Sequence, residues 1–104
     1  MSQTKPLILE VLSGPLDGAI IELVAETAWT KYPSSPLSFP WDEELGEPQA
    51  TLTPETDGWI LTPFRSPHNT YRLNTKERLT DKIVLSGDDI LKASQTWLLV
   101  KKGS

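Results

Sequence analysis

Short apolar or alternating stretches recur along the chain, with turn-forming residues between them. Stretches of this length, rich in β-branched and aromatic residues and bounded by glycine, proline, asparagine or aspartate, are typical of β-strands. A succession of such strands favours an all-β sandwich or barrel. The pattern predicts strands at residues 6–12, 19–24, 29–32, 49–53, 58–62, 71–73, 83–85, 89–92 and 95–100.

The connections carry their own signals. Gly14-Pro-Leu-Asp-Gly18 has strong turn chemistry, so we expect the first two strands to form a hairpin. Residues 54–58 have the composition of a second hairpin loop. Residues 33–48 contain four prolines and are expected to be mostly loop, with at most a short extended piece at 37–39. One stretch departs from the pattern, because Leu79 and Ile83 stand at helical spacing and are compatible with a helical turn.

Composition narrows the class of protein. At 104 residues the chain predicts one domain, with a core over residues 7–100 and flexible ends at 1–5 and 101–104. No apolar run is long enough to span a membrane, and no basic-then-apolar leader is present. The absence of cysteine excludes disulfides and thiolate metal sites. A net charge of −4 argues against nucleic-acid binding, and we take the location as cytoplasmic.

The sequence contains no pattern of residues that is typical of a catalytic site. His68 is the only histidine, so a multi-histidine metal site is excluded. His68 could act as a base for Ser66 as nucleophile, but nothing in the sequence supports that pairing. Asp88-Asp89 after Ser86-Gly87 is best interpreted as a tight turn whose aspartate binds its own backbone. There is no glycine-rich phosphate loop. We therefore expect no enzyme activity, no metal and no cofactor.

The four tryptophans divide by position. Trp59 and Trp97 lie within predicted strands and are expected in the core. Trp29 and Trp41 would be natural contacts if they were exposed in a self-associating or structural domain.

Three stretches in order resemble the forkhead-associated (FHA) domain family over roughly residues 7–100. The opening Leu9-Glu-Val-Leu-Ser-Gly-Pro-Leu-Asp-Gly18 is similar to the family's first hairpin. Leu85-Ser-Gly-Asp-Asp-Ile90 resembles its glycine-aspartate turn near the C-terminus, and Arg65-Ser-Pro-His-Asn-Thr-Tyr71 lies where the family has a serine-x-asparagine-glycine-threonine loop. The resemblance implies an FHA-like β-sandwich of about eleven short strands that reads phosphothreonine peptides with loops at one end.

The family's phosphate-binding positions are altered in this chain. The glycine-arginine pair that supports the phosphate falls on Thr30-Lys31, so the charge is kept while the planar fork of donors is lost. The phosphate-binding serine falls near Gly46, and the histidine three residues on falls near Gln49.

The same comparison applies to the loop at 65–70. The asparagine that holds the peptide backbone falls on His68, and the following glycine falls on Asn69. Ser66 and Thr70 match the family outright, and Arg65 adds a nearby cation. With two neighbouring hydroxyls included, the candidate partner-binding residues are Lys31, Ser34, Ser35, Gly46, Gln49, Arg65, Ser66, His68, Asn69 and Thr70.

Three functions remain open. The first is a non-catalytic protein–protein interaction module, degenerate in its phosphothreonine site, whose partner protein or peptide binds at residues 31–36, 43–49 and 64–70 independently of phosphorylation. The second is a phosphothreonine reader that uses Lys31, Arg65 and Ser66. The third is a structural or self-association domain within a larger assembly. For all three we expect a monomer or weak self-association and no binding to nucleic acid or membrane. Domains that resemble the FHA family and are degenerate in this way occur in bacterial signalling and secretion assemblies.

Overall fold

The computed structural model describes residues 6–32, 35–46, 48–56, 58–64, 70–73 and 77–101. The predicted flexible ends at 1–5 and 102–104 lie outside the described residues, whereas Lys101 is the last residue of a strand. The strands are β1 (Leu7–Val11), β2 (Ile20–Leu23), β3 (Thr27–Thr30), β4 (Leu37–Ser38), β5 (Ala50–Glu55), β6 (Gly58–Pro63), β7 (Thr70–Arg72), β8 (Glu77–Leu79), β9 (Ile83–Val84), β10 (Ile90–Ala93) and β11 (Thr96–Lys101).

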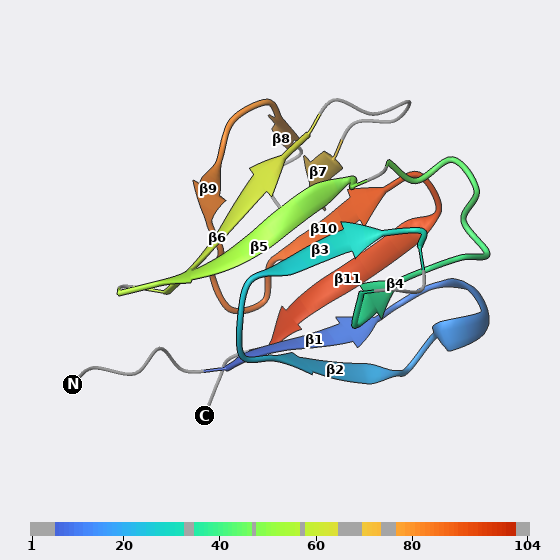
Figure 1. Ribbon diagram of the computed structural model, residues 1–104, viewed down its shortest axis with the longest axis horizontal. Helices are drawn as coiled ribbons and strands as arrows, with labels where there is room; N and C mark the ends of the chain where they lie inside the picture. Colours follow the sequence, from blue (N-terminus) through green and yellow to red (C-terminus); the bar gives the residue numbers. More distant parts are fainter. Residues whose placement is uncertain are drawn as a thin grey trace.

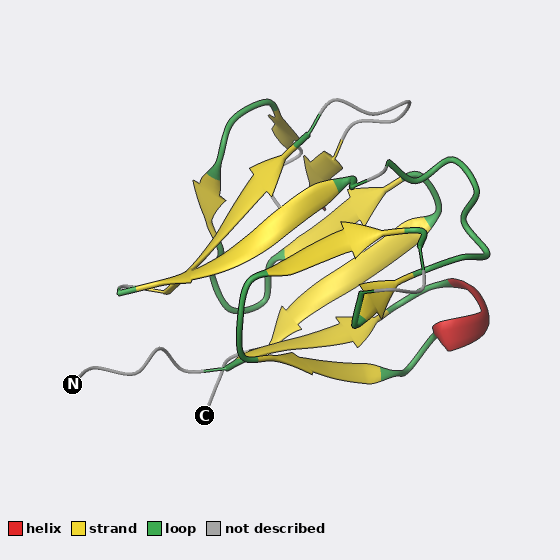
Figure 2. Cartoon of the chain, in the orientation of Figure 1, coloured by secondary structure: helices red, strands yellow, loops and turns green. Residues whose placement is uncertain are grey.

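These strands form two layers, as Figure 1 shows. The six-stranded sheet has the order β2-β1-β11-β10-β7-β8, and the five-stranded sheet has the order β4-β3-β5-β6-β9. All the strand pairs are antiparallel except β3 with β4, which is parallel. The 3-10 turn η1 (Gly14–Leu16) is drawn red in Figure 2. The predicted all-β sandwich of about eleven short strands is thus confirmed.

The first predicted hairpin is confirmed as β1–β2, with Leu9 opposite Ile21. The loop of the second hairpin is shorter than predicted, because β5 continues through Pro54 to Glu55 and β6 begins at Gly58. Pro54 is tolerated inside this strand because it pairs with Trp59, whose carbonyl accepts a hydrogen bond from the Leu85 N–H on the β9 side. The nitrogen of Pro54 therefore points away from β6, beyond the end of β3, where no partner strand needs an N–H donor.

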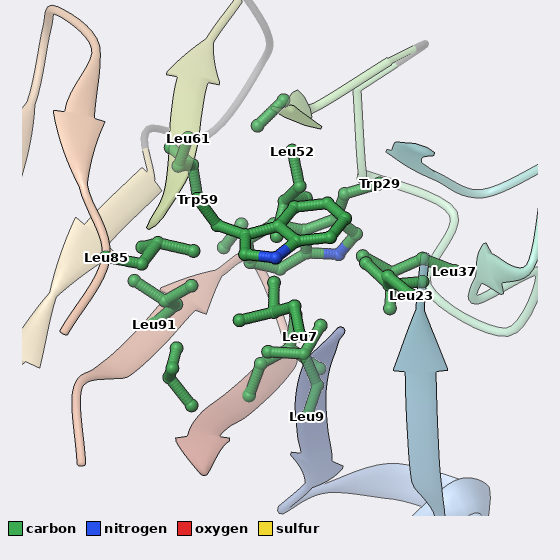
Figure 3. Close-up of a cluster of buried hydrophobic side chains, with 14 of the residues drawn as sticks. Leu7, Leu9, Leu23, Trp29, Leu37, Leu52, Trp59, Leu61, Leu85 and Leu91 are labelled. Atoms are coloured by element: carbon green, nitrogen blue, oxygen red, sulfur yellow. The ribbon is translucent and has the colours of Figure 1, made fainter. Parts of the chain in front are cut away.

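The core lies between the two sheets and is built largely from leucine (Figure 3). Strand alternation produces it directly, since Leu7, Leu9 and Val11 of β1 are buried while the residues between them are partly exposed. The indoles of Trp29 and Trp59 lie in the middle of this cluster, with leucines of both sheets around them (Figure 3).

Two tryptophan assignments change. Trp59 is buried, as predicted, but Trp97 is 37% exposed on the outer face of the six-stranded sheet, so its predicted core position is wrong. Its neighbours Thr96 and Leu98 point inward instead, and alternation forces Trp97 outward. Trp29 has no exposed surface, so it cannot serve as a surface contact.

The helical turn considered near Leu79 is also wrong. Residues 77–79 form β8, and residues 74–76 lie outside the description. Leu79 is buried opposite Thr70 of the six-stranded sheet, whereas Ile83 belongs to β9 of the five-stranded sheet. Their four-residue spacing therefore reflects two different sheets and not one helical face.

Arg72 of β7 links the layers away from the loops. Its Nη2 donates to the Val84 carbonyl at 3.1 Å, and its Nε lies 3.6 Å from Oδ2 of Asp89. Asp89 is itself buried and also accepts the N–H of Ser86 at 2.8 Å, while the Asp89 N–H donates to the Ser86 carbonyl. The predicted tight turn with an aspartate bound to its own backbone is confirmed.

Candidate interaction site at the loop end

The connections β1–β2, β3–β4, β4–β5 and β10–β11 gather at one end of the sandwich, opposite the chain termini (Figure 1). We call this the loop end, comprising the described residues among 12–19, 31–36, 39–49 and 94–95. The candidate residues among 31–36 and 43–49 lie here because β3 ends at Thr30 and β5 begins at Ala50.

Lys31 immediately follows β3. Its ammonium donates to the carbonyl oxygen of Glu43 at 2.9 Å, so it ties the β3–β4 connection to the β4–β5 loop. Next to it, the N–H of Tyr32 donates to Oγ1 of Thr30, and the Tyr32 ring is 50% exposed. The loop end thus presents an aromatic ring beside a cation that is already engaged with the backbone.

Ser35 has a structural role in the same connection. Its hydroxyl donates to the carbonyl of Ala28 and accepts the N–H of Leu37. This pair of bonds sets the start of β4 beside β3, where Trp29 lies opposite Leu37.

Gly46, Gln49 and Thr70 are brought together in the interior. The N–H of Gly46 donates to Oε1 of Gln49 at 2.8 Å, and Nε2 of Gln49 donates to Oγ1 of Thr70 at 2.9 Å. All three residues are buried, and Gln49 has no exposed surface. The side-chain amide of Gln49 therefore fixes the loop from within.

Asp42 has a structural part that sequence reasoning missed. Its carboxylate is 2% exposed and accepts hydrogen bonds from Oγ of Ser94 at 2.7 Å, the N–H of Gln95 at 3.0 Å and Oγ1 of Thr96 at 2.8 Å. Asp42 thus ties the β4–β5 loop to the β10–β11 turn, where Ser94 has a positive φ of 55°. No local signal could have revealed this, because the partners lie more than fifty residues away.

The β1–β2 connection joins the same cluster. Oγ of Ser13 donates to the carbonyl of Gln95 at 2.8 Å and accepts the N–H of Trp97 at 3.0 Å. The indole of Trp41 packs against Gly14 so closely that a Cβ there would collide with the ring. Hydrogen bonds and packing contacts therefore connect the described loops to one another.

The remaining candidates, Ser34, Arg65, Ser66, His68 and Asn69, lie outside the described residues. Within the described ranges no group of three or more histidine, cysteine, aspartate or glutamate side chains is placed to hold a metal ion. The described part of the chain also holds no helix with the length and apolar character needed to cross a membrane.

A two-layer β-sandwich with cross-linked loops at one end belongs to the class of small all-β domains that present a loop surface. No protein-family model matches the chain, and no curated protein sequence matches it either.

Three solved structures are similar to this chain over almost its whole length. The FHA domain of an Arabidopsis thaliana protein has a TM-score of 0.82 and 17% identity, covering 100% of this chain and 92% of that one. The FHA domain of the CT664 protein from Chlamydia trachomatis has a TM-score of 0.81 and 14% identity, covering 95% and 99%. An FHA domain studied for phosphothreonine-dependent interactions has a TM-score of 0.80 and 12% identity, covering 95% and 98%. The resemblance in fold that the sequence motifs predicted is thereby confirmed.

Proposed function

We propose that this domain is a non-catalytic protein–protein interaction module of the FHA fold, whose loop end binds a partner protein without requiring phosphothreonine. The observation that carries this is the buried hydrogen-bond chain from Gly46 through Gln49 to Thr70. A phosphate needs several donors that converge in fixed geometry. The family's phosphate-binding serine falls near Gly46, whose N–H is already donated inward to Gln49.

The cation at the loop end supports the same proposal. Lys31 stands where the family has an arginine, and its ammonium is bonded to the Glu43 carbonyl. A lysine supplies a point charge in place of a planar fork, which weakens bidentate recognition of a phosphate. The cross-linked loops and the exposed ring of Tyr32 form instead a preorganised surface suited to a folded partner or an unmodified peptide.

The test is an NMR titration of the ¹⁵N-labelled domain. The ligands are a degenerate peptide library centred on phosphothreonine, the same library with threonine, and inorganic phosphate. We expect no saturable, phosphate-dependent shift of the Lys31, Ser35, Gly46 and Thr70 amides. Saturable binding of the phosphorylated library alone would overturn the proposal.

A gain-of-function variant guards against an uninformative negative result. Lys31→Arg, Gly46→Ser and His68→Asn together place the family's residues at three altered positions. If the family's chemistry was lost through these positions, the triple variant should acquire phosphothreonine-dependent shifts that the parent lacks. A parent and a variant that bind the phosphorylated library equally would contradict the proposal.

A phosphothreonine reader using Lys31, Arg65 and Ser66 is the second candidate. It is favoured by the fold likeness to a domain studied for phosphothreonine-dependent interactions. It requires that Lys31→Ala or Arg65→Ala abolish a phosphate-dependent interaction, and unchanged binding in both variants would exclude it.

A further inference from the structure

The outer face of the six-stranded sheet carries an unusual line of side chains across four neighbouring strands. Trp97 of β11 lies opposite Lys92 of β10, Lys92 lies opposite Tyr71 of β7, and Tyr71 lies opposite Arg78 of β8. We call Trp97, Lys92, Tyr71 and Arg78 the aromatic–basic row. Because strand residues alternate between faces, the burial of their neighbours Thr96, Ala93, Thr70 and Leu79 places the row on the outer face.

The row is accessible and leads into a wider apolar surface. Trp97 is 37% exposed, Arg78 is exposed, and Tyr71 and Lys92 are partly exposed. The next line of residues on the same face places Leu99 opposite Ile90, both partly exposed. The indole of Trp97 and the aliphatic side chains of Leu99 and Ile90 therefore share one face, and tryptophan, tyrosine and arginine are the residue types enriched at the energetic centres of protein interfaces.

The charges of this face are unevenly distributed. Glu10 lies on the β1 side and pairs with Lys101 at 3.3 Å. The row itself holds two cations and no acid, on a chain of net charge −4. Among the described residues, neither Lys92 nor Arg78 forms an ion pair. The row thus presents positive charge that complements a ligand of opposite sign.

We propose that the aromatic–basic row binds an acidic, extended segment of a partner protein. Carboxylates of the segment would pair with Lys92 and Arg78, and apolar side chains between them would pack on Trp97 and Tyr71. This surface is separate from the loop end, so the inference is independent of whether the loop end reads phosphate.

The spacing of the row indicates the conformation of such a segment. Lys92 and Arg78 are two strands apart, which corresponds to about 9.6 Å, and Trp97 and Tyr71 have the same separation. A polyproline II segment repeats its side-chain direction every three residues, about 9.3 Å. Acidic residues three positions apart, with prolines or leucines between them, therefore match the row when the segment crosses the strands.

Two other occupants share part of this chemistry. Single-stranded nucleic acid also uses aromatic platforms flanked by cations. The chain's overall negative charge, together with Glu10 and Glu22 on the same face, favours a peptide over a polyanion. A second copy of this chain would have to bring its own acidic residues to the row.

The test uses a synthetic peptide in which the triplet glutamate-proline-leucine is repeated four times. Its control peptide has glutamine in place of each glutamate. We expect the acidic peptide to shift the amides of the row and the indole Nε1–H of Trp97 in ¹⁵N spectra, and the neutral peptide to bind at least tenfold more weakly. Failure of the acidic peptide to shift the row, or equal binding of the neutral one, would overturn the proposal.

Charge-reversal variants assign the contact. Lys92→Glu and Arg78→Glu should each weaken the peptide at least tenfold, whereas Lys82→Glu, an exposed lysine next to β9 of the other sheet, should leave it unchanged. Retention of amide dispersion in all three variants shows that they fold. If a short oligothymidylate bound the row more tightly than the peptide, the row would be a nucleic-acid site and the proposal would be wrong. If sedimentation depended on concentration and Lys92→Glu abolished that dependence, the row would be a self-association surface instead.

Discussion

The side-chain amide of Gln49 donates to the hydroxyl of Thr70 at 2.9 Å, joining the loop before β5 of one sheet to β7 of the other. The backbone of Gln49 is equally engaged, since its N–H donates to the Trp29 carbonyl and its carbonyl accepts the N–H of Phe64. A single buried glutamine thus joins the two sheets where the loop end begins.

We expect Gln49→Leu to lower the free energy of unfolding by about 2 kcal/mol, because it leaves the Gly46 N–H and the Thr70 hydroxyl buried without this partner. Urea denaturation measures the change. Gln95→Leu is the matched control, since its side chain is exposed, and it should stay within about 0.5 kcal/mol of the parent. Equal effects of the two substitutions would contradict the assigned role of Gln49.

Asp42 supports the loop end from the opposite side. Asp42→Ala removes the acceptor of three hydrogen bonds and should cost about 3 kcal/mol. It should also raise hydrogen exchange at the Gln95 amide, which donates to this carboxylate. Glu43→Ala removes an exposed carboxylate next to it and should change neither quantity measurably. If exchange at Gln95 were unaltered in Asp42→Ala, the carboxylate would not be the group that holds the β10–β11 turn.

A pair of glycines separates backbone strain from crowding. Gly14 has a φ of +70° and stands against the Trp41 ring, whereas Gly18 has a φ of +93° and nothing within 4 Å of its absent Cβ. Gly18→Ala should therefore cost about 1 kcal/mol from backbone strain alone. Gly14→Ala should cost at least twice that amount and should alter the fluorescence of Trp41, because the ring must move. Similar losses of stability from both substitutions would refute the close packing of Trp41.

The positions of two tryptophans can be checked by conservative replacement. Trp29→Phe leaves a void in the core and should lower the free energy of unfolding by about 2 kcal/mol. Trp97→Phe retains an aromatic ring on an exposed face and should change it by less than about 0.5 kcal/mol. If thermal or urea unfolding showed a larger loss of free energy of unfolding for Trp97→Phe than for Trp29→Phe, the exposed position of Trp97 would be wrong.

The misplacement of Trp97 and of the stretch around Leu79 has a common cause. Residues 96–100 include four consecutive apolar side chains, so alternation alone does not indicate which set faces inward. The choice is made by Asp42, which holds Thr96 inside through a hydrogen bond from a distant loop. Leu79 and Ile83 likewise belong to different sheets. Their spacing along the chain does not indicate which sheet each residue joins.

The features of the candidate site also differ in how far the sequence alone could predict them. Turn chemistry and strand spacing, which are local properties of the sequence, were sufficient to predict an all-β sandwich or barrel, and the motifs around Gly14 and Asp89 pointed to the FHA fold through their resemblance to that family. Whether Gln49 faces a ligand or the interior depends on Gly46 and Thr70 both lying within hydrogen-bond reach, which only the closed sandwich arranges.

The sequence by itself determined an all-β domain and, through its resemblance to the FHA family, the fold of that domain. Its local signals are alternation and turn chemistry, and these act over a few residues. The tertiary structure alone decided that Asp42 and Gln49 are internal supports, and that Trp97, Lys92, Tyr71 and Arg78 meet in one row. The reason is physical: each of these arrangements joins strands or loops far apart in the chain, and a contact of that kind exists only once both sheets have formed.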